Sequence, residues 1–320
     1  MNCTSILIVW VGAHRIGEGV MQVGDMMAFM QYSMQIIMAF MMITMLSIMI
    51  PRASVAAGRI DEVLKSETAI KDPQQPQAFD ETKKGVVEFK DVSFRYPGAE
   101  EPVLHHLNFV AQAGKTTAFI GSTGSGKSTL INLVPRFFDA SEGEVLVDGV
   151  NVKEASQHEL RERIGYVPQK GYLFTGTIAS NLRYAKKGAD EQEMRDASET
   201  AQALEFIENK PEGFETAISQ GGTNVSGGQR QRLSIARALM KNPEIFIFDD
   251  TFSALDFKTD ARLRKALTKM CKERGSTVLM VAQRISSILH ADQIVVLDQG
   301  SVVGIGTHKE LMERCDVYRE

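Results

Sequence analysis

Apolar residues crowd the first part of the chain, where residues 26–50 read MMAFMQYSMQIIMAFMMITMLSIMI and contain no charged residue. As a helix, this stretch would measure roughly 37 Å, which is enough to cross the hydrocarbon core of a bilayer. A buried helix of a soluble domain is rarely so long, and a signal peptide would have basic residues before it and a small-residue cleavage site after it. The pattern therefore predicts one full transmembrane helix.

Charges on either side of this helix predict its orientation. Glu18 and Asp25 precede it, whereas Arg52, Arg59 and Lys65 follow it. Because loops rich in Lys and Arg remain on the cytoplasmic side, we expect the C-terminal end of the helix to face the cytoplasm.

A shorter apolar run at about residues 4–13 cannot cross a bilayer by itself. The sequence GEGVMQVGD follows it as a loop would, so we interpret the run as the remnant of a preceding transmembrane helix; a segment lying at the membrane surface is the alternative. Polar residues within the full span must face protein or a water-filled cavity, so they line a substrate path or form hydrogen bonds between helices. These residues are Gln31, Tyr32, Ser33 and Gln35.

The helical pattern continues past Pro51 and ends before KDPQQPQ, a sequence typical of a linker. Beyond it the chain has the composition of a soluble domain, with short apolar strand patterns between helical ones. We therefore expect the C-terminal part of a transmembrane domain (residues 1–66), a linker (67–85) and a globular domain (86–320).

The charge of the chain argues against nucleic-acid binding, and its cysteines argue against a disulfide framework. The formal charge of −4 and the pI near 6.0 offer no basic surface for a phosphate backbone, so nucleic acid is not an expected partner. Cys3, Cys271 and Cys315 are isolated and form neither a CxxC motif nor an even disulfide framework. A reduced, cytosolic location is therefore expected for most of the chain.

A glycine-rich loop with the sequence GSTGSGKST follows the apolar strand TTAFI and satisfies the pattern GxxxxGK[ST]. Its glycines allow backbone N–H groups to surround phosphate oxygens, and the helix that begins at about Lys127 adds its dipole. Lys127 would reach the terminal phosphates and Ser128 would bind Mg²⁺. The predicted ATP-binding residues are Gly121, Ser122, Thr123, Gly124, Ser125, Gly126, Lys127, Ser128 and Thr129.

A second apolar strand, residues 245–248, ends at Asp249, where a carboxylate can hold the water shell of Mg²⁺ as a Walker B residue does. Open α/β folds bind ligands at the carboxyl ends of their parallel strands. The two motifs together predict an α/β P-loop ATPase with Mg²⁺ and ATP at this edge of the sheet.

The sequence NVSGGQRQRLSIARAL precedes this strand and separates the chain from kinases and GTPases. Here the chain resembles the ATP-binding cassette (ABC) family, whose signature is LSGGQ, and the resemblance covers residues 86 to about 311. It implies a nucleotide-binding domain with a helical subdomain. It also implies that the signature meets the γ-phosphate of ATP held by an opposing domain, so one copy cannot complete a site. The signature residues are Ser226, Gly227, Gly228 and Gln229, after Val225.

The resemblance extends to three further motifs. Tyr96 resembles the A-loop aromatic that stacks on adenine, and Gln169 resembles the Q-loop glutamine that contacts Mg²⁺ and senses movement of the membrane helices. The D-loop, which crosses the dimer interface in this family, corresponds to Ser253, Ala254, Leu255 and Asp256. The predicted metal ligands are thus Ser128, Gln169 and Asp249.

A membrane helix that runs through a linker into the cassette resembles ABC exporters rather than importers. This implies ATP hydrolysis coupled to efflux across the cytoplasmic membrane, a second ABC half-transporter as partner, and contact with membrane lipid. The transported substrate would be a small molecule, a lipid or a peptide. The full-length protein would cross the membrane several times and hold its ATP-binding domain in the cytoplasm. Since exporters of this kind supply six membrane helices per half, we expect this chain to be a piece of a longer product.

Two positions depart from the family pattern. Asp250 stands where active cassettes have the catalytic glutamate, and its shorter side chain withdraws the carboxylate by more than an ångström. Gln283 stands where the family has the switch histidine, and it cannot carry an imidazolium charge. Together with Gln169, these residues form the predicted catalytic set. The pair, and the sequence SQGGTNVSGGQ, resemble the degenerate-site member of heterodimeric exporters.

Three alternatives remain open from the sequence. A homodimeric exporter would hydrolyse ATP at a normal rate by itself. A soluble ABC ATPase of DNA repair or translation would lack a membrane span. A catalytically weak regulatory ABC subunit would share every motif but transport no substrate.

Overall fold

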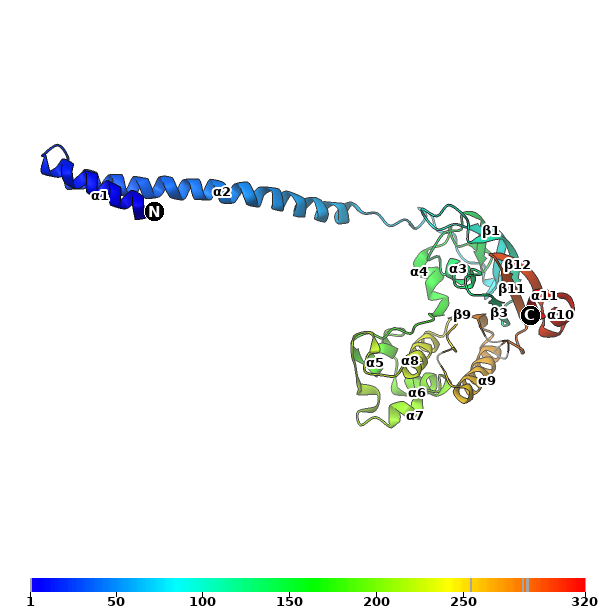
Figure 1. The fold of residues 1–320 in the computed structure, drawn as a ribbon. Helices are drawn as coiled ribbons and strands as arrows, with labels where there is room; N and C mark the ends of the chain where they lie inside the picture. Colours follow the sequence, from blue (N-terminus) through cyan, green and yellow to red (C-terminus); the bar gives the residue numbers. More distant parts are fainter. Residues whose placement is uncertain (1, 254, 284, 286–287, 320) are drawn as a thin grey trace. The chain divides into compact units, whose positions relative to one another are not determined.

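The structure is a computed structural model that describes residues 2–253, 255–283, 285 and 288–319. The chain divides into two compact units, Met1–Ala69 and Ile70–Glu320 (Figure 1). The boundary falls within the segment whose composition predicts a linker, so most of that segment belongs to the second unit.

The first unit consists of two helices that pack beside each other, α1 (Asn2–Gly17) and α2 (Val23–Lys65) (Figure 1). Gly12 permits this approach, because a Cβ atom there would lie 2.8 Å from the Met26 side chain. In the part of the chain that the structure describes, α2 is the one helix long and apolar enough to cross a membrane. It contains the predicted span and its continuation as one helix.

Polar residues inside α2 satisfy their hydrogen bonds within the helix. The hydroxyls of Ser33, Thr44 and Ser47 donate to carbonyl oxygens four residues earlier, at 2.7, 2.9 and 2.9 Å. This pairing lets a hydroxyl lie in apolar surroundings without an unpaired donor. The helix also continues through Pro51, which lacks an N–H donor.

The second unit begins with a four-stranded antiparallel sheet in the order β2-β1-β4-β5. Its inward residues belong to a large apolar cluster that includes Phe89, Phe109 and Val147. The strands are β1 (Val87–Phe94), β2 (Leu104–Ala111), β4 (Glu142–Val147) and β5 (Val150–Asn151).

A six-stranded sheet follows in the order β12-β11-β3-β10-β9-β6, parallel except for the edge strand β12. Because it is buried on both faces, its central strands read as continuous apolar runs. The strands are β3 (Thr116–Gly121), β6 (Ile164–Val167), β9 (Ile245–Asp249), β10 (Thr277–Val281), β11 (Gln293–Asp298) and β12 (Ser301–Gly306).

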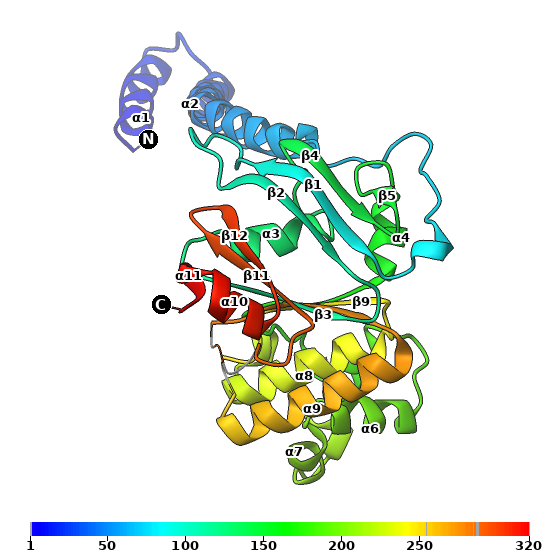
Figure 2. The same cartoon turned by 90° about the vertical axis from the view of Figure 1, so that its right-hand side faces the viewer.

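Alternate residues of the central strand β9 point to opposite faces of this sheet. Ile245 and Ile247 join the apolar cluster that contains α3 (Lys127–Leu133), whereas Phe246 and Phe248 join a second cluster that contains α8 (Gly227–Met240). Figure 2 accordingly shows α3 between the two sheets and α8 on the far side of the six-stranded sheet. The predicted α/β fold with a helical subdomain is confirmed.

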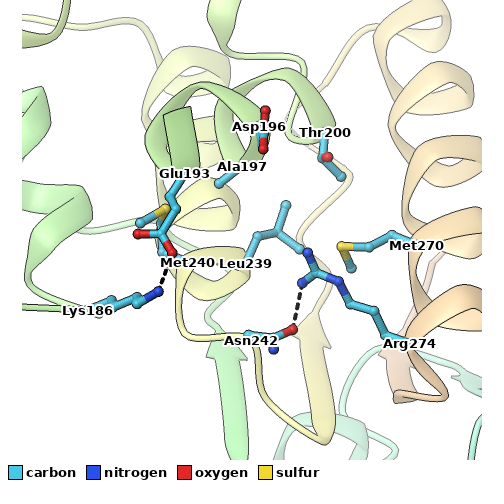
Figure 3. A pocket seen from close by; sticks show the side chains of 10 residues that line it. All are labelled: Lys186, Glu193, Asp196, Ala197, Thr200, Leu239, Met240, Asn242, Met270 and Arg274. Atoms are coloured by element: carbon cyan, nitrogen blue, oxygen red, sulfur yellow. Dashed lines mark hydrogen bonds and ion pairs between the residues drawn. The ribbon is translucent and has the colours of Figure 1, made fainter. Parts of the chain in front are cut away.

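The helical subdomain packs around α8 and α9 (Figure 2). A cavity of about 200 Å³ lies among α6, α8 and α9 (Figure 3). Two pairs of its lining side chains interact: Lys186 forms an ion pair with Glu193, and Arg274 donates to Asn242 at 2.7 Å. The subdomain comprises β7 (Gly176–Thr177), α5 (Ile178–Arg183), α6 (Glu191–Thr200), α7 (Leu204–Glu208), β8 (Ala217–Ile218), α8 and α9 (Phe257–Arg274). Besides α3, the described part of the unit outside this subdomain contains α4 (Gln157–Glu162), α10 (His308–Arg314) and α11 (Asp316–Arg319).

Residues 70–85 run along the second unit as a strap. Asp72 accepts hydrogen bonds from the backbone and the side chain of Gln157, at 3.1 and 2.8 Å. Further along, Phe79 is buried beneath the guanidinium of Arg163, which lies 4.6 Å from the ring centroid. The strap therefore attaches to the domain through specific side chains, which its Pro- and Gln-rich composition does not reveal.

Candidate functional site

The phosphate-binding loop lies where β3 ends and α3 begins, as the sequence predicts. Gly126 caps α3 with a left-handed backbone (φ 93°), and a Cβ atom there would lie 2.5 Å from Leu104. Gly121 is equally constrained, since a Cβ atom would lie 2.0 Å from the carbonyl oxygen of Leu297. Both positions require glycine, which keeps the loop tight against the neighbouring strands.

Lys127 extends back into this loop. Its ammonium donates to the carbonyl oxygens of Gly121 and Ser122 at 2.8 and 2.7 Å, and to the Ser125 hydroxyl at 3.3 Å. Burial lowers the pKa of Lys127, and the nearby carboxylates Asp250 and Asp249 oppose that shift. The loop thus holds a cation at its centre, where phosphate oxygens can replace the carbonyl acceptors.

Ser128 and Asp249 form a pair suited to a hard metal ion. The Ser128 hydroxyl donates to Asp249 Oδ1 at 2.8 Å. Adjacent ligands of an octahedral Mg²⁺ at about 2.0–2.1 Å lie roughly 2.9 Å apart, so these two oxygens fit neighbouring positions. Burial raises the pKa of Asp249, the Ser128 hydrogen bond opposes the rise, and Asp250 adds to it. A divalent cation would favour the ionised carboxylate, and its chemistry would be to neutralise phosphate charge.

Asp250 is 6% exposed and lies under two glutamine amides. Gln169 and Gln283 both donate through Nε2 to the same oxygen, Asp250 Oδ2, at 3.0 and 2.8 Å. The Asp250 backbone adopts a left-handed conformation (φ 44°), which is uncommon for a residue with a side chain. The Ser253 hydroxyl supports this turn by donating to the Asp250 carbonyl at 2.9 Å.

Gln169 comes from the segment after β6, and its amide meets Asp250 from a distance of 81 residues in the sequence. The structure therefore brings together Lys127, Ser128, Asp249 and Gln169, and their assignment to one ATP site stays a prediction. The predicted catalytic residues Asp250 and Gln283 join the same group of contacts.

Tyr96 is held beside the loop by its hydroxyl, which shares a hydrogen bond of 3.0 Å with Thr129. Its ring makes edge contacts with Phe94 and Phe138, with centroids 4.8 and 5.2 Å apart. These contacts fix a half-buried aromatic ring next to the start of α3, which is where an adenine-stacking residue is expected.

The signature lies on the other side of the six-stranded sheet, at the start of α8. Ser226 caps this helix: Gln229 N–H donates to the Ser226 hydroxyl at 3.2 Å, and Ser226 N–H donates to Gln229 Oε1 at 3.1 Å. Ser226 and Gly227 are exposed. The free N–H groups of a capped helix start favour an anion, so the motif has the form of an anion site directed at solvent.

The predicted D-loop follows Asp250. Leu255 is buried, and Asp256 caps α9 by accepting from Thr259 N–H at 3.0 Å. Ala254 lies outside the described residues.

Sequence reasoning missed Gln231, which holds the backbone around Gln169. It is 2% exposed, and its amide bridges both sides of Gln169: Nε2 donates to Pro168 O at 3.1 Å, and Oε1 accepts from Gly171 N–H at 2.9 Å. The available signal was a polar residue on the buried face of an amphipathic helix, which usually has a specific partner.

The comparisons with known proteins all find similarity to proteins of the ABC transporter type. The family described as ABC transporter matches residues 104–253. An uncharacterized ABC transporter ATP-binding protein of Mycobacterium tuberculosis is 47% identical over 324 residues, which cover 100% of this chain and 55% of that protein. An ATP-dependent lipid A-core flippase of Haemophilus influenzae is 46% identical over 241 residues, covering 75% of this chain and 41% of the flippase.

A solved structure, described as a bacterial Atm1-family ABC exporter with ATP bound, matches with a TM-score of 0.80 and 31% identity. The match covers 99% of this chain and 55% of that one. The chain thus spans about half the length of the proteins it resembles.

Proposed function

Because the chain belongs to the ABC transporter family, we propose that it provides the last membrane helix and the ATP-binding domain of an exporter subunit. Its ATP-binding domain works with a second such domain across a shared nucleotide interface. The subunit lies in the cytoplasmic membrane, with residues 70–320 in the cytoplasm. The long apolar helix α2 and the basic residues that follow it support this orientation.

ATP and Mg²⁺ bind to this chain's own loop in the proposed complex. The loop N–H groups and Lys127 hold the phosphates, Ser128 and Asp249 hold the metal ion, and Tyr96 stacks on the base. Gln169, whose Nε2 donates to Asp250, would hold the metal ion through its amide oxygen. The signature at Ser226 to Gln229 faces ATP held by the partner, so each nucleotide lies between two chains.

Hydrolysis at this chain's own Walker residues is slow. The observation that supports this is the arrangement at Asp250, where one carboxylate oxygen accepts from both Gln169 and Gln283. Because Oδ2 already accepts two hydrogen bonds, an attacking water must use the other oxygen, Oδ1, or displace one of the amides. The shorter side chain of aspartate also keeps the carboxylate back from the phosphate, and misplacement on this scale reduces rates on the order of 10²-fold.

The partner is a different half-transporter whose own Walker residues are complete. Its ATP is hydrolysed against this chain's SGGQ signature, whose capping geometry is regular. ATP at this chain's site stays bound and holds the pair together, while hydrolysis at the other site resets the transporter.

The transported substrate is a lipid or another amphipathic molecule. The lipid A-core flippase of H. influenzae, which resembles this chain over its ATP-binding part, supports a lipid. Stimulation of ATPase activity by candidate lipids in proteoliposomes tests this assignment; hydrophilic peptides that stimulate more strongly than any lipid would overturn it.

The double substitution Asp250→Glu with Gln283→His tests the slow site. In the reconstituted complete pair, with the partner's catalytic glutamate changed to glutamine, we expect ATP hydrolysis to rise by about 10-fold or more. An unchanged rate would show that these two positions do not limit hydrolysis. A wild-type subunit that hydrolyses ATP at a normal rate without a second gene product would instead support a homodimer.

A further inference from the structure

The signature helix α8 holds the segment that carries Gln169. Gln231 bonds the backbone on both sides of Gln169, at Pro168 and Gly171 (3.1 and 2.9 Å). Since Gln231 is 2% exposed, water cannot replace these two hydrogen bonds.

Other side chains hold the same segment at its two ends. Arg237, also on α8, donates to the Tyr172 carbonyl at 2.8 Å, and Thr251 donates to the Val167 carbonyl at 3.1 Å. Gly171 packs directly on the helix, because a Cβ atom there would lie 2.6 Å from the Ser234 hydroxyl. The backbone of residues 168–172 therefore lies against α8, whereas Thr251 holds Val167 beside the end of β9. The Gln169 side chain reaches away from α8 to Asp250.

The same helix begins at the signature. Gln231 lies five residues after Ser226, which corresponds to roughly 7.5 Å along the helix axis. The buried face of α8 packs into one apolar cluster from Leu233 to Met240, so the helix is held as a single body. A displacement at Ser226 is therefore passed to Pro168 and Gly171 through Gln231.

We propose that Gln231 is a positioning residue that couples the two ATP sites of the pair within this one chain. This inference rests on the proposed function, in which Ser226 meets the partner's nucleotide. ATP at the partner's site sets the position of α8, and α8 sets the position of Gln169 through Gln231. The position of Gln169 then decides whether its hydrogen bond to Asp250 is kept or broken. Occupation of one site thereby changes the affinity of the other, and the effect is reciprocal.

The test measures ATP affinity at this chain's own site in the complete pair. Tyr96→Trp places a fluorescent reporter beside that site, and ATP is titrated with the partner's site either competent or disabled through the partner's P-loop lysine. The ratio of the two dissociation constants is the coupling. We expect the wild-type Gln231 pair to show a coupling of at least about 5-fold.

Gln231→Met keeps the side-chain length and removes both hydrogen bonds, so the ratio should fall to about one, while affinity with the disabled partner stays within about twofold. Gln231→Glu keeps the acceptor for Gly171 N–H and loses the donor to Pro168, so it should give an intermediate ratio. Its more conservative shape also provides the test if the Met variant does not fold.

Arg232→Met is the matched control on the next position of α8. Arg232 donates to Gln202 O at 2.6 Å and to Gly228 O within its own helix at 3.4 Å, and it lies 4.9 Å from the Phe206 ring. It has no hydrogen bond to residues 167–172 among the described contacts, so it tests α8 without the link to Gln169. We expect this variant to keep the wild-type ratio. An unchanged ratio in both Gln231 variants, or an equal loss in Arg232→Met, would overturn the proposal. A wild-type pair that forms no shared ATP site would contradict the proposed function instead.

Discussion

The Walker residues and the signature lie on opposite faces of the same sheet, and they are built in different ways. The Walker site collects Lys127, Gln169, Asp250 and Gln283 from segments far apart in the sequence. The signature is one continuous turn of chain that closes its own capping hydrogen bonds. A site assembled from distant segments loses its geometry when one side chain is shortened by a methylene. A local cap keeps its geometry whatever happens elsewhere.

This contrast matches where the chain departs from the family pattern. The departures at Asp250 and Gln283 belong to the assembled site. The local motif retains SGGQ and differs from the family signature only in Val225, which stands in place of leucine. A chain in a pair with two composite sites can therefore lose hydrolysis at one while continuing to serve the other. Substitutions in one of these two regions should affect activity differently from substitutions in the other.

The largest effect is expected from Gly227→Asp. A Cβ atom at Gly227 meets nothing within 4 Å, so the substitution fits the fold and places a carboxylate in the anion site. ATPase activity of the pair should fall by about 10²-fold or more, because the partner's γ-phosphate meets a negative charge. Steady-state phosphate release measures the loss. Gly227→Ala, which adds only a methyl group in the same space, is the control; equal activity of the Asp and Ala variants would show that the signature does not meet ATP.

A small effect is expected when Asp250 is changed to asparagine. If hydrolysis takes place at the partner's site, the ATPase rate of the pair should change by less than about twofold. The same assay with the partner's catalytic glutamate changed to glutamine should abolish nearly all turnover. A large loss from Asp250→Asn would place the working site on this chain and remove the asymmetry between the two regions.

An effect on stability rather than on activity is expected at the strap, residues 70–85, which contacts the rest of the ATP-binding domain through the buried Asp148. Its carboxylate accepts from Gly85 N–H at 2.7 Å and from Arg163 at 3.1 Å, and it is fully buried. Burial raises the pKa of Asp148 to about 6 from an ordinary value of 3.8. Protonation therefore stabilises the folded state below about pH 6, and this contribution is lost as the pH rises through that value.

Asp148→Asn cannot titrate. The stability of the wild-type protein relative to this variant should therefore decrease by up to about 3 kcal/mol between about pH 4 and about pH 7. Urea unfolding at several pH values measures the difference. If the stability of the wild-type protein relative to the variant stays constant with pH, or increases as the pH rises, then the fold does not disfavour the ionised Asp148 carboxylate.

The sequence predicted what depends on neighbours along the chain. The strand, glycine loop and helix around Lys127 follow from local steric requirements, and α2 follows from its long apolar pattern. The two hydrogen bonds that Gln169 and Gln283 donate to Asp250 were not predictable. The three residues come together because β6, β9 and β10 are neighbours in the sheet. The strap from residue 70 has the composition of a linker, and its attachment was not predictable because it depends on Gln157 and Arg163, which are remote in sequence.

The unbroken course of α2 has a consequence for helical phase. At 100° per residue, the face on which Gln31 and Gln35 lie in the apolar part is the face on which Ala53 and Ile60 lie in the charged part. One residue inserted after Pro51 would turn the charged part by roughly 100° relative to the apolar part, whereas four residues would turn it by only about 40°. The two parts of this helix therefore have a fixed rotation relative to each other about the helix axis. Insertions of different length would show whether rotation of one part is transmitted to the other.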